Sequence, residues 1–122
     1  MKRIIGIMFL LTSSVSFADH LDVIGFTLDE DCSFSDYMEI VGDFNAWGEE
    51  RGYQTEIAAP VHHDNMQTYY WIGRSANGET FGKAYDEWVA GLFDEDSGPY
   101  ALNERFRDCA INDSRRSYLT YP

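Results

Sequence analysis

The chain has few cysteines and few cations for its length, and both shortages restrict what it can be. Two cysteines in 122 residues are too few for a disulfide-dense small domain or a zinc site with four cysteine ligands. Nine Lys and Arg stand against 21 Asp and Glu, which gives a net charge of −12. Because nucleic acids and anionic membrane surfaces are polyanions, we expect neither as a partner. Hydrophobic residues make up 44% of the chain, so it is predicted to fold, and its length favours one domain.

The sequence also lacks the short motifs that mark common catalytic sites. It has no Gly-x-Ser-x-Gly, no phosphate-binding loop, no dinucleotide fingerprint and no Cys-x-x-Cys pair. Its three histidines are His20 and the neighbours His62 and His63, which would point to opposite sides of an extended chain. A metal site needs three or four converging ligands, so we predict no metal, no cofactor and no dedicated catalytic residue. The acidic runs 29–31 and 94–96 are predicted to be solvated loops, with a weak divalent-ion site as the alternative.

The first eighteen residues have the pattern of a secretory signal peptide. Two cations precede an apolar run over residues 4–11, and small residues stand three and one positions before a cut after Ala18. The alternative is a membrane anchor, but this run is much shorter than the ~20 residues of a spanning helix. We therefore predict a signal peptide at 1–18 and a single domain at 19–122, periplasmic or secreted and free of the membrane after cleavage. Losing both cations and no acid would leave 104 residues with a net charge of −14.

Hydrophobic spacing predicts four strands, two long helices and a short third helix. Runs of β-branched and aromatic residues indicate strands, and apolar residues three or four positions apart indicate helices. Ser33 and Asp36 form the pattern of a capping box at a helix start, and Gly52 is typical of a helix end. The predicted elements are a strand over 20–28, a helix over 33–51, strands over 53–61 and 68–75, a helix over 81–92, a short helix over 99–109 and a strand over 115–121.

This order is the βαββαβ pattern of the ferredoxin-like fold, with one extra short helix before the last strand. The predicted fold class is α+β, with an antiparallel sheet and helices packed on one of its faces. The alternative is a different α+β sandwich built from the same elements.

The predicted topology brings the two cysteines together. In a ferredoxin-like sheet the last strand lies antiparallel beside the first, so the end of one meets the beginning of the other. Cys32 comes just after the first strand, and Cys109 lies six residues before the predicted last strand. Because an exported chain with two cysteines favours a disulfide, we predict a Cys32–Cys109 bond rather than a redox pair.

Two strand segments are apolar on both faces: Val23 to Phe26 and Tyr69 to Ile72. Helices cover only one face of such a sheet, so the other face needs a second cover. We predict a homodimer that forms through the sheet faces, with Trp71 or Tyr70 in the interface. The alternative is a monomer whose own short third helix or N-terminal tail covers that face.

Three segments carry a resemblance at the level of architecture: the helix from Phe34 to Trp47, the segment from Tyr69 to Arg74 and the helix from Phe81 to Leu92. In their order, the chain resembles the dimeric α+β barrel superfamily, in which two ferredoxin-like protomers press sheet against sheet. It also resembles uncharacterised exported proteins of bacteria. The superfamily resemblance implies pockets that lie between the sheet and the helices.

A cation at the end of an apolar pocket can fix an anionic ligand, so the expected partner is a small apolar or anionic ligand. The predicted ligand-binding residues are Phe26, Tyr69, Trp71 and Arg74. For Arg74, and equally for Arg115 and Arg116, the alternative is a salt bridge to one of the many carboxylates.

Three functions are compatible with the sequence. The favoured one is an exported, non-catalytic homodimer that binds a small ligand or another protein. The superfamily resemblance implies a second, an enzyme, because that superfamily includes cofactor-free monooxygenases and haem-processing proteins. The third is a structural or stress-related acidic envelope protein. A pocket lined by Phe26, Tyr69, Trp71 and Arg74 would favour the first two, and a filled, dry sheet face would favour the third.

Overall fold

The computed structural model describes residues 19–122, so the predicted signal peptide at 1–18 lies outside the described residues. The elements in chain order are β1 (Asp19–Leu28), α1 (Phe34–Glu49), β2 (Gln54–Ala58), β3 (Tyr69–Ser75), α2 (Gly78–Gly91), α3 (Gly98–Cys109) and β4 (Ala110–Thr120).

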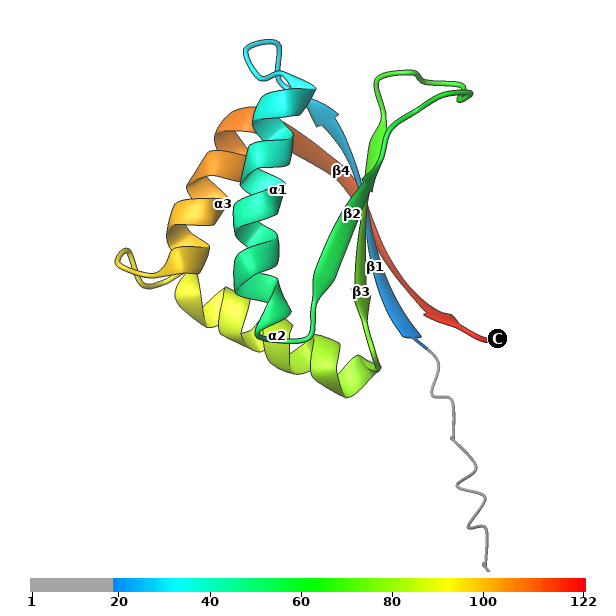
Figure 1. Ribbon diagram of the computed structural model, residues 1–122. Coiled ribbons are helices and arrows are strands. Elements are labelled where there is room, and N and C mark those ends of the chain that lie inside the picture. Colours follow the sequence, from blue (N-terminus) through cyan, green and yellow to red (C-terminus); the bar gives the residue numbers. More distant parts are fainter. Residues whose placement is uncertain (1–18) are drawn as a thin grey trace, which may run out of the picture.

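Four strands form one antiparallel sheet in the order β2-β3-β1-β4, and all three helices lie on the same face of it (Figure 1). The α+β class and the antiparallel sheet are therefore as predicted from the sequence. The element order is β-α-β-β-α-α-β, because α3 is added to the plain βαββαβ pattern before the last strand. Within residues 19–122, no helix combines the length and the hydropathy that crossing a bilayer requires.

Two predicted strand boundaries were wrong. The last strand begins at Ala110, directly after α3, and not at 115. Its first residues are mostly polar, so they carry no hydrophobic pattern; pairing with β1 specifies the strand, with a register shift opposite Gly25 and Phe26. The second strand stops at Ala58, because Pro60 just beyond it has no N–H to donate to the sheet.

Local sequence signals set the ends of α1. The Ser33 hydroxyl accepts a hydrogen bond from the Asp36 N–H at 3.0 Å, and the Asp36 carboxylate accepts one from the Ser33 N–H at 3.1 Å. This reciprocal pair is the predicted capping box. In the turn after the helix, Gly52 has φ of 70°, a left-handed conformation that favours glycine.

Strand register decides which side chains meet the helices. Asp22, Ile24 and Phe26 of β1 alternate with Leu21 and Val23, and the two sets point to opposite faces. Phe26 is fully buried and stacks on Tyr37 of α1, with 4.5 Å between ring centroids, which identifies the first set as the one that faces the helices.

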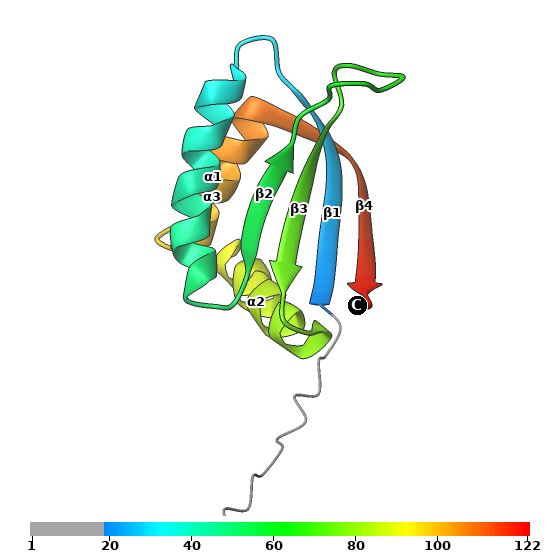
Figure 2. The same ribbon diagram turned by 45° about the vertical axis from the view of Figure 1, so that its right-hand side comes forward.

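The opposite, open face carries the other set. Figure 2 shows this sheet with every helix behind it on the same side. Leu21, Val23, Tyr70 and Ile72 occupy the two central strands of this open face. The third helix packs with α1 and α2 on the other side, so the alternative in which it covers the open face is wrong.

The predicted disulfide between Cys32 and Cys109 is confirmed. Their Cα atoms lie 5.1 Å apart, within the usual range for a disulfide. Beside them the Asp29 N–H donates to the Cys109 carbonyl at 2.8 Å, so the loop after β1 is fastened to the junction of α3 and β4.

Candidate functional site

A cavity of about 390 Å³ lies between the sheet and the helices. This volume is within the range of pockets that bind small molecules. Most of its lining is apolar, and nearly half of the lining side chains are aromatic. The aromatic residues are Tyr37, Phe44, Trp47, Tyr53, Trp71, Phe81, Tyr85, Trp88 and Phe106.

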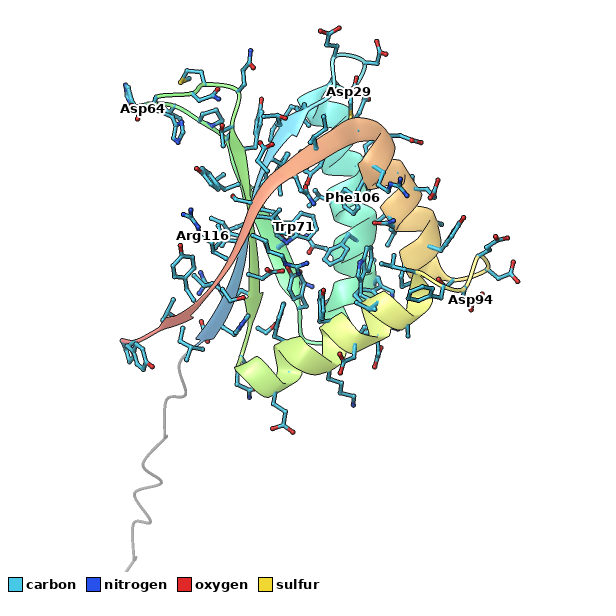
Figure 3. The ribbon with its side chains drawn as sticks, turned by 180° about the vertical axis from the view of Figure 1, so that it is seen from behind. Asp29, Asp64, Trp71, Asp94, Phe106 and Arg116 are labelled. Carbon is cyan, nitrogen blue, oxygen red and sulfur yellow. A yellow bond between two sulfur atoms is a disulfide. The ribbon has the colours of Figure 1, made fainter. Side chains whose placement is uncertain are left out.

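Trp71 is at the centre of the aromatic lining. Its ring meets Phe44 of α1 edge-on at a centroid distance of 4.7 Å and Phe106 of α3 at 5.5 Å. Trp71 and Phe106 point toward one another across the space between sheet and helices (Figure 3). Phe44 also contacts Trp88 of α2 at 5.5 Å, so rings from all three helices surround this side of the cavity. Edge-to-face packing of this kind fixes ring orientations as well as burying apolar area.

A chain of hydrogen bonds crosses the sheet side of the cavity. The indole Nε1 of Trp71 donates to the Tyr53 hydroxyl at 2.7 Å, and that hydroxyl donates to Oδ2 of Asp22 at 2.9 Å. Arg115 donates two hydrogen bonds to the same carboxylate, from Nε to Oδ1 at 2.9 Å and from Nη2 to Oδ2 at 2.7 Å. Asp22 is only 1% exposed, so its charge is buried but fully paired.

Glycine makes room for this network. The Tyr53 side chain crosses the backbone of Gly73, where a Cβ atom would overlap its hydroxyl group. Gly73 pairs with Asp22 across the sheet, so the missing side chain lets the Tyr53 hydroxyl reach the carboxylate. Any larger residue at position 73 would displace the tyrosine from the network.

Two members of the network, Tyr53 and Arg115, are each held in one protonation state. Burial, and then the negative charge of Asp22, raise the pKa of Tyr53 well above its usual range, so the hydroxyl stays protonated. Burial opposes the charge on Arg115, but the hydrogen bonds and the negative charge of Asp22 outweigh it and raise the pKa of the guanidinium. Tyr53 is therefore a hydrogen-bond donor and not a base at neutral pH.

The mouth of the cavity is marked by its exposed lining residues. These include Tyr85 of α2, Arg107 of α3, and Asn112 and Arg115 of β4. The Arg115 guanidinium lies over the Tyr85 ring, 5.0 Å from its centroid. The cavity is thus open to solvent between α2, α3 and the edge strand β4.

The four predicted ligand-binding residues are not brought together. Trp71 lines the cavity, as proposed from the sequence. Phe26 and Tyr69 stack on each other at 5.6 Å in the packed core and do not line it. Arg74 lies on the open face, where it forms a half-exposed ion pair with Asp19 at 3.1 Å. The alternative of a salt bridge therefore holds for Arg74.

Sequence reasoning did not select Asp22 or Tyr53, and it left Arg115 undecided. The signal that could have found Asp22 is a carboxylate in the middle of a mostly apolar strand, because such a charge needs a buried partner. Arg115 is the partner that the structure supplies.

The histidines and the acidic runs do not line the cavity. His20 stacks on Phe81 with 4.1 Å between centroids, whereas His62 and His63 lie in the exposed segment between β2 and β3. The runs 29–31 and 94–96 are exposed and lie outside helices and strands. Among residues 19–122, no three His, Cys, Asp or Glu side chains come close enough together to hold a metal ion.

Comparison with known proteins gives similarity in fold only. No protein-family model matches the chain, and no curated protein matches it. Among solved structures, the chain is similar to SnoaB, a cofactor-independent oxygenase from Streptomyces nogalater, with a TM-score of 0.58 and 11% identity over 86% of this chain and 95% of that one. It is also similar to At3g17210 from Arabidopsis thaliana, with a TM-score of 0.53 and 10% identity over 86% and 94% of the two chains.

A third similar structure is a conserved protein of unknown function from Bacteroides thetaiotaomicron. Its TM-score is 0.50, and its identity is 9% over 86% of this chain and 99% of that one. These similarities confirm the predicted fold of the protomer and nothing beyond the fold.

Proposed function

We propose that this chain is an exported, non-catalytic protein that binds a small aromatic molecule in the cavity between its sheet and its helices. The observation that carries the proposal is the cavity itself, which has a volume of about 390 Å³, a mostly apolar lining in which nearly half of the side chains are aromatic, and one fixed polar side. Pockets of that size and composition are typical of small-molecule sites. The Cys32–Cys109 disulfide supports export, because such bonds persist in oxidising compartments.

The polar side of the cavity favours binding over catalysis. A general base needs a free acceptor atom, and its pKa must lie near the operating pH. Both oxygens of Asp22 already accept hydrogen bonds from Arg115, one of them also from Tyr53, and Tyr53 stays protonated. The hydrogen-bonded residues therefore form a rigid side of the cavity, which is suited to orienting a ligand.

Cofactor-independent oxygenation is the second candidate. It is supported by the fold shared with SnoaB and by an aromatic cavity, since such chemistry can use the substrate's own electrons. Oxygen consumption with a bound compound, measured in an oxygen electrode, separates the two candidates: an oxygenase consumes oxygen and a binding protein does not.

The cavity proposal predicts that a neutral aromatic dye binds in the cavity and that a substitution which fills the cavity weakens this binding. N-phenylnaphthylamine, which fluoresces in apolar surroundings, is expected to bind to the mature protein. Val89→Trp should weaken that binding at least tenfold, because Val89 lines the cavity and a larger ring would fill it. The matched control is Ala90→Trp, the next residue of α2, which is exposed and does not line the cavity.

Equal dye binding by Val89→Trp and the unmodified protein would contradict the proposal. Thermal melting of both variants separates loss of the site from loss of the fold. Native mass spectrometry of protein purified from its own host would also report any ligand that is retained.

We further propose that the protein acts as a homodimer through the open face of the sheet. One row across this face reads Glu56, Ile72, Val23, Arg116, from β2 at one edge to β4 at the other. A two-fold axis parallel to the strands and between two such sheets would bring the acid of one protomer over the arginine of its partner. The two apolar side chains would then meet in the middle, which makes the face self-complementary.

The dimer proposal predicts twice the chain mass in light scattering of the mature protein at micromolar concentration. Tyr70→Glu should convert the dimer to a monomer, because Tyr70 lies on the open face and a charge there would be buried unpaired. Phe93→Glu is the control, since Phe93 is 87% exposed in the loop after α2. Trp71, the other predicted interface residue, faces the cavity and does not test the dimer. A Tyr70→Glu protein that stays dimeric, or an unmodified protein that is monomeric, would overturn the proposal.

A further inference from the structure

The charge balance of the cavity is the reverse of that of the chain. Acidic residues outnumber cationic ones by 21 to 9 in the whole sequence. Among the residues that line the cavity, however, Arg107 and Arg115 are cationic and only Asp22 is acidic. The lining of this cavity carries more cations than acids although the chain as a whole is acidic. This balance favours an anionic ligand.

Arg115 still has a free donor after it has paired with Asp22. Its Nε and Nη2 atoms bind the two carboxylate oxygens, and within residues 19–122 its third nitrogen, Nη1, makes no hydrogen bond. The Tyr85 ring lies 5.0 Å from the guanidinium carbon and helps to fix the plane of the group. An arginine held in one plane with an unused N–H presents a ready donor to a ligand.

Arg107 is also available. Its ion pair in the described part of the chain is with Glu104 at a long 3.9 Å, and the Arg107 side chain is 73% exposed. Exposed pairs of this kind contribute little and exchange readily. The side-chain amides of Asn103 and Asn112 line the same cavity, and neither makes a hydrogen bond within residues 19–122. The mouth therefore has several donors whose partners are weak or missing.

We propose that the natural ligand is an aromatic acid: a flat ring system with one carboxylate or sulfonate. This inference rests on the proposed ligand-binding function and adds the chemical class and the orientation of the ligand. The rings lie among the aromatic side chains around Trp71, and the acidic group lies at the mouth. There it accepts hydrogen bonds from Arg107 and from Nη1 of Arg115, and charge-assisted bonds of this kind are stronger than neutral ones.

Two dyes that share one aromatic skeleton test the inference. Anilinonaphthalene sulfonate carries an anion, and N-phenylnaphthylamine does not. In fluorescence titrations of the mature protein, we expect the sulfonate to bind about tenfold more tightly than the neutral dye. Val89→Trp should weaken both dyes, which shows that both occupy the cavity.

Arginine variants then locate the anion. Arg107→Gln should lower the affinity for the sulfonate about three- to fivefold and leave the neutral dye unchanged. Arg105→Gln is the matched control, because Arg105 is on the same helix, pairs with Asp43 at 2.7 Å and does not line the cavity. Arg115→Lys keeps a positive charge beside Asp22 but removes Nη1, so it too should reduce the preference for the sulfonate. If Arg115→Lys fails to fold, Arg107→Gln decides alone.

The outcomes separate this inference from the proposed function. Failure of both dyes to bind overturns the ligand-binding function. Binding of both dyes with equal affinity overturns only the aromatic-acid inference, and so does a preference for the sulfonate that Arg107→Gln and Arg105→Gln reduce equally.

Discussion

Replacing Asp22 by alanine is expected to lower the free energy of unfolding by about 3–5 kcal/mol. The carboxylate is 1% exposed and accepts hydrogen bonds from Tyr53 and, twice, from Arg115. Its removal would leave the guanidinium half-buried beside a small void without its counter-charge. The Tyr53 hydroxyl would also lose its acceptor, while Trp71 still donates to it. Urea unfolding at constant pH, followed by aromatic fluorescence, measures the change.

Asp19→Ala is the matched control for this prediction. Asp19 lies on the same strand and also pairs with an arginine, Arg74, at 3.1 Å, but both side chains are nearly half exposed. Its removal should cost no more than about 1 kcal/mol. Asp22→Asn should fall between the two, because it keeps the volume and one acceptor but loses the charge. An Asp22→Ala protein that is as stable as Asp19→Ala would contradict the buried network.

The parts of the fold that the sequence predicted are those with local or topological signals. The capping box at Ser33 and Asp36 is a contact between residues three positions apart, so it can be recognised in the sequence. The Cys32–Cys109 pair spans 77 positions, but the strand order implied where the two residues would meet. The start of β4 had no such signal, because Asn112, Asp113 and Ser114 near its beginning are polar and only pairing with β1 positions them.

The candidate site depended on which face of each strand is covered, and the sequence left that open. In β3, Trp71 and Arg74 are three positions apart, so an alternating strand places them on opposite faces. That parity alone argues against a pocket that contains both residues. For β1 the same parity puts Asp22 on the face of Phe26, but both faces of this strand look apolar.

The polar network could not be found by spacing at all. Tyr53 and Asp22 are 31 positions apart, and Arg115 is 93 positions from Asp22. Their contact depends on the register of β1 against β4 and on the absence of a side chain at Gly73. A shift of one residue in the β1–β4 pairing would move the arginine to the open face and leave the buried carboxylate without its counter-charge.

Removing the disulfide with Cys32→Ala and Cys109→Ala together is expected to lower the free energy of unfolding by about 4 kcal/mol. The bond closes a loop of 77 positions, and the loss of chain entropy in the unfolded state alone corresponds to about 4.5 kcal/mol at that length. Both ends of the bond are also held by other contacts, since the Asp29 N–H binds the Cys109 carbonyl and α1 keeps its capping box at Ser33. The native fold should therefore survive, with an unchanged far-ultraviolet spectrum and a lower urea midpoint.

Reduction of the unmodified protein provides the control for this double variant. Without reductant, the denatured mature protein should titrate with no free thiol, and with reductant its urea midpoint should fall to that of the variant. If the loss of stability comes from loop closure, the slope of free energy against urea should rise, because the uncross-linked chain exposes more surface when it unfolds. A midpoint that neither reduction nor substitution changes would mean that the stability of this small acidic domain comes from its aromatic core without the cross-link.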